Sequence, residues 1–194
     1  MKKIGVLALQ GNFSEHVAVL NKMGVNAGEV RLAGQLDELD GLIIPGGEST
    51  TIGKLATDFN LIDPLRKFGK TKPIWGTCAG AIFLSTDTVG RKQPILGLMD
   101  IRIERNAFGR QIASFETDLD IPAIVQADEK PAPFHAIFIR APLIAAVGNA
   151  VKVISRLPDG RIVAARQENL LATSFHPELT NDDRFHRYFL SIIN

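Results

Sequence analysis

Short apolar runs alternate with helical patterns in the first half of the chain, and this alternation constrains the fold more than any other feature. Strands are predicted at Ile4–Leu9, Gly41–Ile44 and Pro73–Trp75, and helices at Glu15–Met23 and Thr50–Phe59. Strands that alternate with helices are typical of a parallel sheet with helices on both faces. We therefore expect an α/β fold with an open, mostly parallel sheet.

The second half has a different rhythm, because β-like segments follow one another with few helices between them. A Pro-Asp-Gly turn at 158–160 indicates a hairpin, and an amphipathic helix is predicted at Asp182–Ile193. We expect Asp118–Pro133, which is rich in proline and acidic residues, to run over the surface. The predicted strands are Ile101–Arg105, His135–Ile139, Val151–Arg156, Arg161–Arg166 and Leu170–Phe175, and two further short helices are predicted to end at Phe68 and to span Ala79–Leu84.

Length and charge exclude several classes of protein. At 194 residues the chain is long enough for one sizeable core and too short for two ordinary domains, so we expect residues 1–194 to form a single domain. A net charge of +1 provides no basic field for nucleic acid or anionic lipid. The single cysteine, Cys78, excludes an internal disulfide and argues against a thiolate metal site. We expect no metal and no cofactor.

The amino terminus resembles a secretory signal only superficially. Lys2 and Lys3 precede a run of only six residues, Ile4–Leu9, and polar residues follow at once. Such a run is shorter than the roughly 7 to 15 residues that a signal requires, so we interpret it as a buried strand. With no later stretch of the roughly 18 apolar residues that span a bilayer, we expect a soluble, cytoplasmic protein.

The strongest local signal is a strand that runs through Gly76-Thr-Cys78-Ala-Gly80 into a predicted helix. Small residues on both sides of Cys78 allow the sharp turn of a nucleophile elbow. A thiol there lies at a helix N-terminus, which favours the thiolate, and the Ala79 amide could donate to an oxyanion. The alternative is that Cys78 is a small buried apolar residue.

A thiolate nucleophile needs a base, and His176 is the best candidate among the four histidines. It follows a predicted strand and so emerges at the sheet edge where open α/β folds build their sites. Glu178, two residues on, could orient the imidazole. For His16, His135 and His186 we expect packing or surface roles.

A third signal is Pro45-Gly-Gly-Glu-Ser-Thr-Thr51, directly after a predicted strand. Its glycines free backbone amides to approach a ligand, so the loop could supply a second oxyanion donor. The pattern of a phosphate loop is absent. On its own the segment could also be a simple turn before a capped helix.

Together these segments resemble a class I, or triad, glutamine amidotransferase, a superfamily with a flavodoxin-like fold to which further antiparallel strands are added. Within it the chain is most similar to the glutaminase subunits of pyridoxal 5'-phosphate synthases. The segments that carry the resemblance are Ile4–Gly11, Pro45–Thr51, Gly76–Gly80, Glu104–Gln111, Phe138–Pro142, Val163–Gln167 and Ser174–Thr180.

The resemblance implies a glutaminase that hydrolyses L-glutamine to L-glutamate and ammonia. The ammonia would pass to a separate, barrel-shaped synthase subunit that makes pyridoxal 5'-phosphate. That compound would be the product of the complex and not a cofactor of this chain. The net charge of +1 fits a subunit that takes a zwitterionic amino acid and leaves phosphorylated substrates to its partner.

The resemblance also implies roles for individual residues. Cys78 would be the nucleophile, His176 the base and later the acid, and Glu178 its orienter. Gly47 and Ala79 would donate to the oxyanion, and Gln10 would contact the partner and arrange the oxyanion loop. The residues expected to bind L-glutamine are Gly47, Glu48, Ser49, Arg105, Ile139 and Arg140.

Some readings remain open beside this one. Many members of the superfamily carry glutamine four residues after the nucleophile, where this chain has Ile82, and Gln126–Phe134 cannot be aligned. The alternatives are a glutaminase that serves another synthase, a non-catalytic thiol-sensing module of the same fold, and a cysteine peptidase.

Overall fold

The structure is a computed structural model that describes residues 2–90, 92–105, 114–125 and 132–193. Its helices are α1 (Phe13–Lys22), α2 (Ser49–Asp58), α3 (Ile62–Gly69), α4 (Ala79–Leu84) and α5 (Arg184–Ile192), with short 3₁₀ helices η1 (Ala33–Leu36), η2 (Pro122–Ile124) and η3 (Pro177–Leu179). Its strands are β1 (Lys3–Leu7), β2 (Asn26–Val30), β3 (Gly41–Ile44), β4 (Ile74–Thr77), β5 (Ser85–Val89), β6 (Met99–Glu104), β7 (Ser114–Leu119), β8 (Phe134–Ile139), β9 (Leu143–Val147), β10 (Lys152–Arg156), β11 (Ile162–Gln167) and β12 (Leu170–Thr173).

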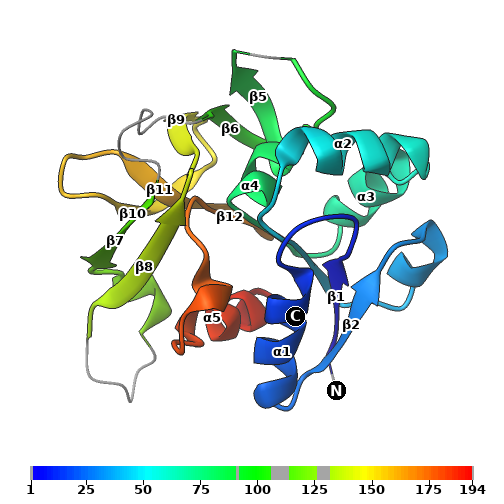
Figure 1. The fold of residues 1–194 in the computed structure, drawn as a ribbon, viewed down its shortest axis with the longest axis horizontal. Helices are drawn as coiled ribbons and strands as arrows, with labels where there is room; N and C mark the ends of the chain where they lie inside the picture. The colour runs from blue at the N-terminus through cyan, green and yellow to red at the C-terminus, as the bar shows by residue number, and fades with distance from the viewer. Residues whose placement is uncertain (1, 91, 106–113, 126–131, 194) are drawn as a thin grey trace.

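One large mixed sheet organises the molecule (Figure 1). Its strand order is β2-β1-β3-β4-β12-β11-β9-β6-β5, with β10 paired to β11, and β7 and β8 form a separate antiparallel pair. The strands from β2 to β12 in this order are all parallel. The antiparallel pairings begin at β11, so the predicted mostly parallel sheet with added antiparallel strands is confirmed.

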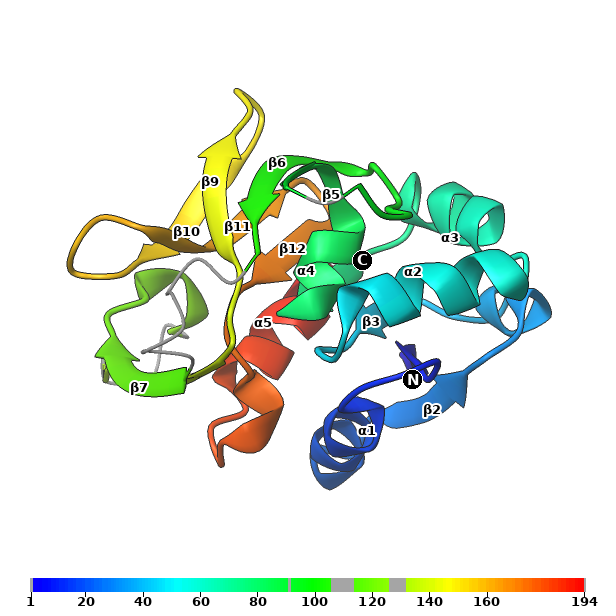
Figure 2. The same ribbon diagram turned by 45° about the horizontal axis from the view of Figure 1, so that its top comes forward.

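Helices cover both faces of the parallel half of the sheet, as predicted. One core contains the apolar sides of α2, α3 and α4, among them Ile52, Leu65 and Phe83. The other contains Leu20 of α1, Phe185 of α5 and the buried side of β8. Figures 1 and 2 show α2 and α3 on one side of the central strands and α1 and α5 on the other. The parallel strands are therefore buried on both faces, which explains their continuous apolar runs.

The prediction of a surface excursion at Asp118–Pro133 is wrong for its first part. Leu119, Ile121 and Ile124 are each less than 5% exposed and pack in the core that contains α5. The prolines and acidic residues that suggested a surface loop alternate with these apolar residues, and the alternation buries one side of the segment. Residues 126–131 lie outside the described part of the chain.

Sequence patterns also missed β2, β5, β7 and β9. β2 reads Asn-Ala-Gly-Glu-Val and is mostly exposed at the sheet edge, so it carries no apolar run. β5 has only one buried residue, Ser85. An edge strand that is covered on few sides can form with little hydrophobic signal, because its neighbour supplies the hydrogen bonds.

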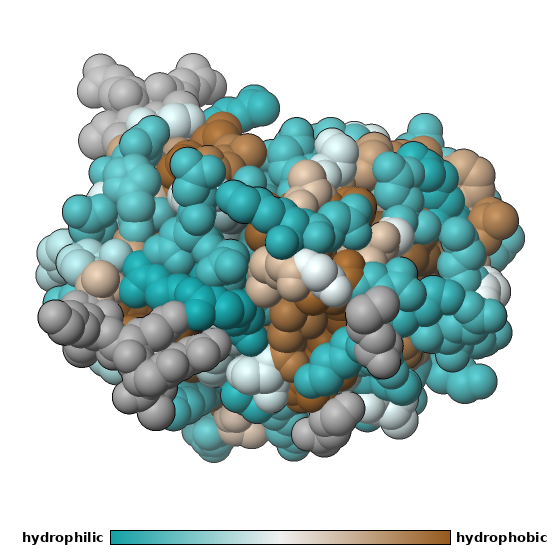
Figure 3. Space-filling model, turned by 90° about the horizontal axis from the view of Figure 1, so that it is seen from below, coloured by the Kyte–Doolittle hydropathy of each residue, from teal (hydrophilic) through white to brown (hydrophobic). Residues whose placement is uncertain are grey.

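The surface seen from below is largely hydrophilic, with hydrophobic side chains visible in a hollow between hydrophilic ones (Figure 3). Among the described residues, no helix is both long and apolar enough to cross a bilayer.

Candidate active site

Four neighbouring parallel strands deliver the candidate residues to one edge of the sheet. β1, β3, β4 and β12 lie side by side in this order. Their carboxyl ends lead to Gln10, to the loop at Gly46–Glu48, to Cys78 and to His176, respectively. The carboxyl edge of an open α/β sheet is where such folds form their sites. Residues that are far apart in sequence therefore meet because their strands are parallel neighbours.

Cys78 occupies a strained turn between β4 and α4. Its φ of 47° and ψ of −107° are unusual for a residue with a side chain. Cys78 is the N-cap residue of α4. A Cβ on Gly80 would lie 2.0 Å from the carbonyl oxygen of Ile44, and one on Gly76 would lie 2.5 Å from that of Gly80. Only glycine permits this close packing, so the geometry agrees with the predicted nucleophile elbow.

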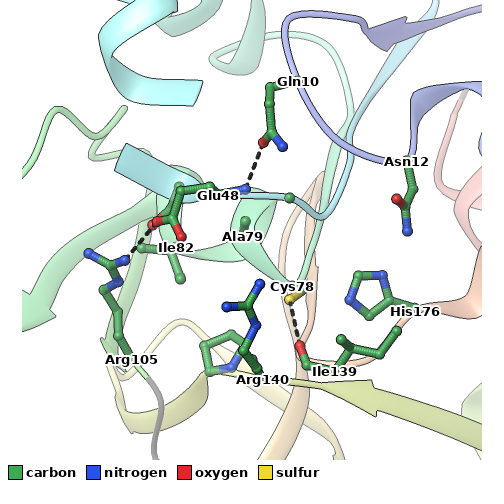
Figure 4. A pocket seen from close by; sticks show the side chains of 13 residues that line it. Gln10, Asn12, Glu48, Cys78, Ala79, Ile82, Arg105, Ile139, Arg140 and His176 are labelled. Carbon is green, nitrogen blue, oxygen red and sulfur yellow. Dashed lines mark hydrogen bonds and ion pairs between the residues drawn. The ribbon is translucent and has the colours of Figure 1, made fainter. Parts of the chain in front are cut away.

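His176 and Glu178 form a buried pair beside the thiol. His176 Nδ1 lies 2.7 Å from Glu178 Oε1, and both residues are at most 5% exposed. A Cβ on Gly46 would lie 2.4 Å from Cε1 of His176 and 3.2 Å from Cβ of Cys78, so ring and thiol flank the same glycine. The thiol itself faces the carbonyl oxygen of Ile139 at 3.9 Å (Figure 4). Because Nδ1 faces the carboxylate, Nε2 is the nitrogen left for the sulfur.

The charged forms of His176 and Glu178 are stabilised by their neighbours. Burial lowers the pKa of His176, but hydrogen bonds and charge interactions with Cys78 and Glu178 outweigh it and raise the pKa to about 10. Burial raises the pKa of Glu178, and the interactions with His16 and His176 outweigh it and lower the pKa to about 2. Near neutral pH the carboxylate is therefore ionised, and the imidazolium is the favoured form of His176.

The glycine loop is held by the loop that follows β1. The backbone N–H of Glu48 donates to Gln10 Oε1 at 2.6 Å, and the Asn12 N–H donates to the Gly46 carbonyl oxygen at 3.0 Å. Gly47 lies against Gln10, since a Cβ there would be 2.3 Å from Oε1. Gln10 thus fixes the segment that is predicted to supply an oxyanion donor, and Figure 4 shows it bound to Glu48.

A cavity of about 340 Å³ opens above Cys78, within the usual size range of small-molecule sites. Its lining residues are Gln10, Asn12, Gly47, Glu48, Ser49, Cys78, Ala79, Ile82, Arg105, Ile139, Arg140, Pro142 and His176. Every residue that the sequence predicted for the site lines this cavity, except Glu178, which lies behind His176. Sequence analysis assigned no site role to Asn12, Ile82 or Pro142.

Charged groups of both signs face the cavity. Arg105 Nη2 lies 2.8 Å from Glu48 Oε1, and Arg105 Nη1 donates to Gln93 Oε1 at 3.0 Å. In Figure 4, Arg140 and His176 lie on opposite sides of Cys78. A guanidinium next to a carboxylate suits a ligand that carries both an α-carboxylate and an α-ammonium group.

Two further observations bear on the sequence predictions. Asn12 Nδ2 donates to Glu178 Oε1 at 3.2 Å, a role that its place just after Gln10-Gly11 could have suggested. His16 and His186 are completely buried, and His135 is exposed between Glu116 and Asp118.

Residues 106–113, which include most of the Glu104–Gln111 segment, lie outside the described part of the chain, as do residues 126–131 of Gln126–Phe134. Among the described residues, no group of three or more His, Cys, Asp or Glu could hold a metal ion.

Sequence comparisons find a matching family model and similar proteins. The SNO glutamine amidotransferase family model matches residues 6–194. The "Pyridoxal 5'-phosphate synthase subunit PdxT" of Herpetosiphon aurantiacus is 56% identical over 193 residues, which cover 97% of this chain and 99% of the relative. The protein of the same name from Moorella thermoacetica is 53% identical over 192 residues, 98% of this chain and 99% of the relative.

Solved structures share the fold. A crystal structure of a glutamine amidotransferase superposes with a TM-score of 0.90 at 48% identity, covering 98% of both chains. The structure of PurLQS from Thermotoga maritima superposes with a TM-score of 0.72 at 18% identity, covering 100% of this chain and 99% of the other, which shows the fold alone.

Proposed function

Because the chain belongs to the SNO glutamine amidotransferase family, we propose that it hydrolyses L-glutamine to L-glutamate and ammonia as the glutaminase subunit of a pyridoxal 5'-phosphate synthase. The observation that carries the proposal is the buried His176–Glu178 pair, with a 2.7 Å contact, beside a lone thiol on an elbow. A thiol-sensing module does not need this pair, whereas a thiolate hydrolase does.

Glutamine would lie in the cavity with its side-chain amide next to Cys78. Arg105 and Arg140 can receive its α-carboxylate, and Glu48 its α-ammonium group. Gly47, Ser49 and Ile139 line the same cavity and would complete the binding site. In each assignment the side chain and the ligand group that it binds carry opposite charges, and the side chains all line one cavity of about 340 Å³.

The first half of the reaction forms a thioester. The Cys78 thiolate attacks the amide carbon, and the resulting oxyanion would accept hydrogen bonds from the backbone amides of Ala79 and Gly47. The imidazolium of His176 then gives its Nε2 proton to the leaving nitrogen, and ammonia departs. Glu178 holds Nδ1 throughout and stabilises the imidazolium.

In the second half, water replaces ammonia. Neutral His176 removes a proton from the water, hydroxide attacks the thioester carbon, and the thiolate leaves as glutamate forms. We propose that the ammonia passes to a barrel-shaped synthase subunit. Its incorporation there would explain why this chain needs no site for sugar phosphates.

The test is glutamate release from glutamine by the full chain, with and without the synthase subunit. We expect a low rate for the chain alone and a strong increase with the partner, because uncoupled hydrolysis would waste glutamine. Equal rates in both conditions would contradict the coupling.

A second measurement tests the nucleophile. In the complex, Cys78→Ala should abolish cofactor synthesis from glutamine and leave synthesis from ammonium salts intact. His135→Gln, at an exposed site on β8, is the matched control and should retain both activities. Glutamine-dependent synthesis by Cys78→Ala would rule out Cys78 as the nucleophile.

A further inference from the structure

Two buried histidines extend the His176–Glu178 pair into the core. His16 of α1 and His186 of α5 are both 0% exposed. His16 Nε2 lies 3.3 Å from Glu178 Oε2, and His16 Nδ1 lies 3.0 Å from His186 Nε2. From the sequence, only packing or surface roles are expected for these two histidines. Their contacts instead connect α5, α1 and the triad through ring nitrogens.

The protons of this chain of contacts can be assigned in order. Glu178 is ionised and accepts only, so favourable contact with Oε2 requires a proton on His16 Nε2. In a neutral ring Nδ1 then carries the lone pair, and His186 Nε2 must donate to it. This leaves His186 Nδ1 unprotonated, and that atom indeed has no hydrogen-bond partner among the described residues.

The opposite assignment fails on the same contacts. Thr77 Oγ1 lies 3.3 Å from His16 Nε2 and could in principle donate to it. In that tautomer the lone pair of Nε2 would face the Glu178 carboxylate, which is repulsive at 3.3 Å. With the proton on Nε2, the hydroxyl oxygen of Thr77 and the carboxylate can both attract it.

Both histidines are neutral near pH 7. Burial lowers the pKa of His16 below its ordinary value, and Glu178 opposes this only partly. Burial is the main cause that lowers the pKa of His186 to about 3. His16 is therefore a dipole aimed at Glu178 and not a competing cation for the carboxylate.

We propose, on the basis of the proposed glutaminase function, that His16 is a positioning residue whose Nε2–H holds Glu178 Oε2, so that Oε1 stays directed at His176. Oε1 already receives Asn12 Nδ2 at 3.2 Å and His176 Nδ1 at 2.7 Å. Oε2 has no hydrogen-bond partner among the described residues, and its contact with His16 Nε2 at 3.3 Å is an electrostatic one. Without His16, this buried oxygen would lose its stabilisation, and the carboxylate could rotate or take up a proton.

The expected consequence lies in the reactivity of Cys78. A less firmly held or protonated Glu178 stabilises the imidazolium of His176 less, so the ion pair with the Cys78 thiolate should form over a narrower pH range. The titratable and charged groups that face this cluster from the packed elements are Cys78, His176, Glu178, His16, His186 and Glu15.

The test compares His16→Gln with His16→Asn in the full chain. The glutamine amide nitrogen can reach the position of Nε2, whereas the asparagine amide is one methylene shorter and cannot. The readout is the rate of Cys78 alkylation by iodoacetamide from pH 5 to pH 9. We expect the profile of His16→Asn to differ from that of the wild type, with alkylation confined to a narrower pH range, and the profile of His16→Gln to stay close to that of the wild type.

The second readout is glutaminase kinetics in the presence of the synthase subunit. His16→Asn should lower kcat roughly 10- to 100-fold with little change in KM, and His16→Gln should recover most of kcat. Leu20→Val, in the same helix but with no polar group to offer Glu178, is the control for stability and should leave the pH profile unchanged. The denaturation midpoint of each variant shows whether it is folded.

The outcomes separate the two proposals. Equal pH profiles for the wild type, His16→Asn and His16→Gln would overturn the role of His16 and leave the glutaminase proposal intact. An equal change of the pH profile in both variants would also overturn the role of His16, because a hydrogen-bond donor at the position of Nε2 would then make no difference. A wild type that releases no glutamate in the presence of the synthase subunit would instead count against the glutaminase proposal itself.

Discussion

At the scale of single residues, the site depends on side chains that are buried with their partners. His176 and Glu178 are nearly inaccessible, yet both can be charged, because Cys78 and Glu178 stabilise the imidazolium while His16 and His176 stabilise the carboxylate. Removing one member leaves an uncompensated buried charge, so such residues act as a unit. The residue types and the two-residue spacing are visible in the sequence, but the depth of burial is not.

Arg105 offers a residue-scale test of substrate binding. Its guanidinium contacts Glu48 and Gln93 at the cavity mouth, so Arg105→Gln should raise KM for glutamine about tenfold or more while kcat changes little. Steady-state kinetics with the synthase subunit present measure both constants. Arg102→Gln, an exposed residue of β6 that lies just before Arg105 in the sequence and is paired with Asp87, is the control. A fall in kcat at constant KM would assign Arg105 to the chemical step and not to binding.

At the scale of elements, the turn between β4 and α4 determines where the nucleophile lies. The predicted bounds Ala79–Leu84 for the helix are those of α4, because this continuous apolar segment follows Cys78 directly and ends before the polar Ser85. The same reasoning failed for β2 and β5, where a neighbouring strand provides the hydrogen bonds and the segment itself has almost no apolar pattern.

Gly80→Ala tests the packing of this elbow. A Cβ would lie 2.0 Å from the backbone oxygen of Ile44, which cannot move without shifting β3, so we expect the free energy of unfolding to fall by about 3 kcal/mol or more. Gly34→Ala is the control, because nothing lies within 4 Å of its Cβ position. Urea denaturation of both variants gives the difference, and equal stabilities would show that the elbow is not closely packed.

At the scale of the whole molecule, buried histidines make stability depend on pH. The pKa of His186 is lowered from 6.5 to about 3, so the unfolded chain binds a proton that the folded chain refuses. The free energy of unfolding should therefore fall as pH drops from about 6.5 toward 3. The effect of His176 on the free energy of unfolding has the opposite sign. Its pKa is raised to about 10, so its contribution to stability is lost as pH rises from 6.5 to 10.

His186→Gln isolates the acid limb of this profile. Glutamine can still donate to His16 Nδ1 but does not titrate, so the loss of stability between pH 6.5 and pH 4, on the order of a few kcal/mol in the wild type, should become smaller. Chemical denaturation at several pH values provides the measurement. The basic limb should not change, and an unchanged acid limb would show that His186 is not the group responsible.

The sequence by itself was enough to predict the parallel strands β1, β3, β4 and β12, the elbow around Cys78, the pairing of His176 with Glu178 and the loop at Gly46–Glu48. These are local features, because apolar periodicity, small residues at a turn and short spacings act over a few neighbouring positions. The resemblance to triad glutamine amidotransferases then supplied the substrate and the residues that bind it.

Only the tertiary structure decided which distant groups meet. The burial of Leu119 and Ile124, the support of Glu178 by Asn12 and His16, and the contact of His16 with His186 all join segments from different parts of the chain. No periodicity encodes such contacts, because they depend on the order of strands in the sheet and on which helix covers which face. His16, for which the sequence predicts only a packing or surface role, becomes a candidate part of the site because the fold packs α1 against the end of β4 and beside Glu178.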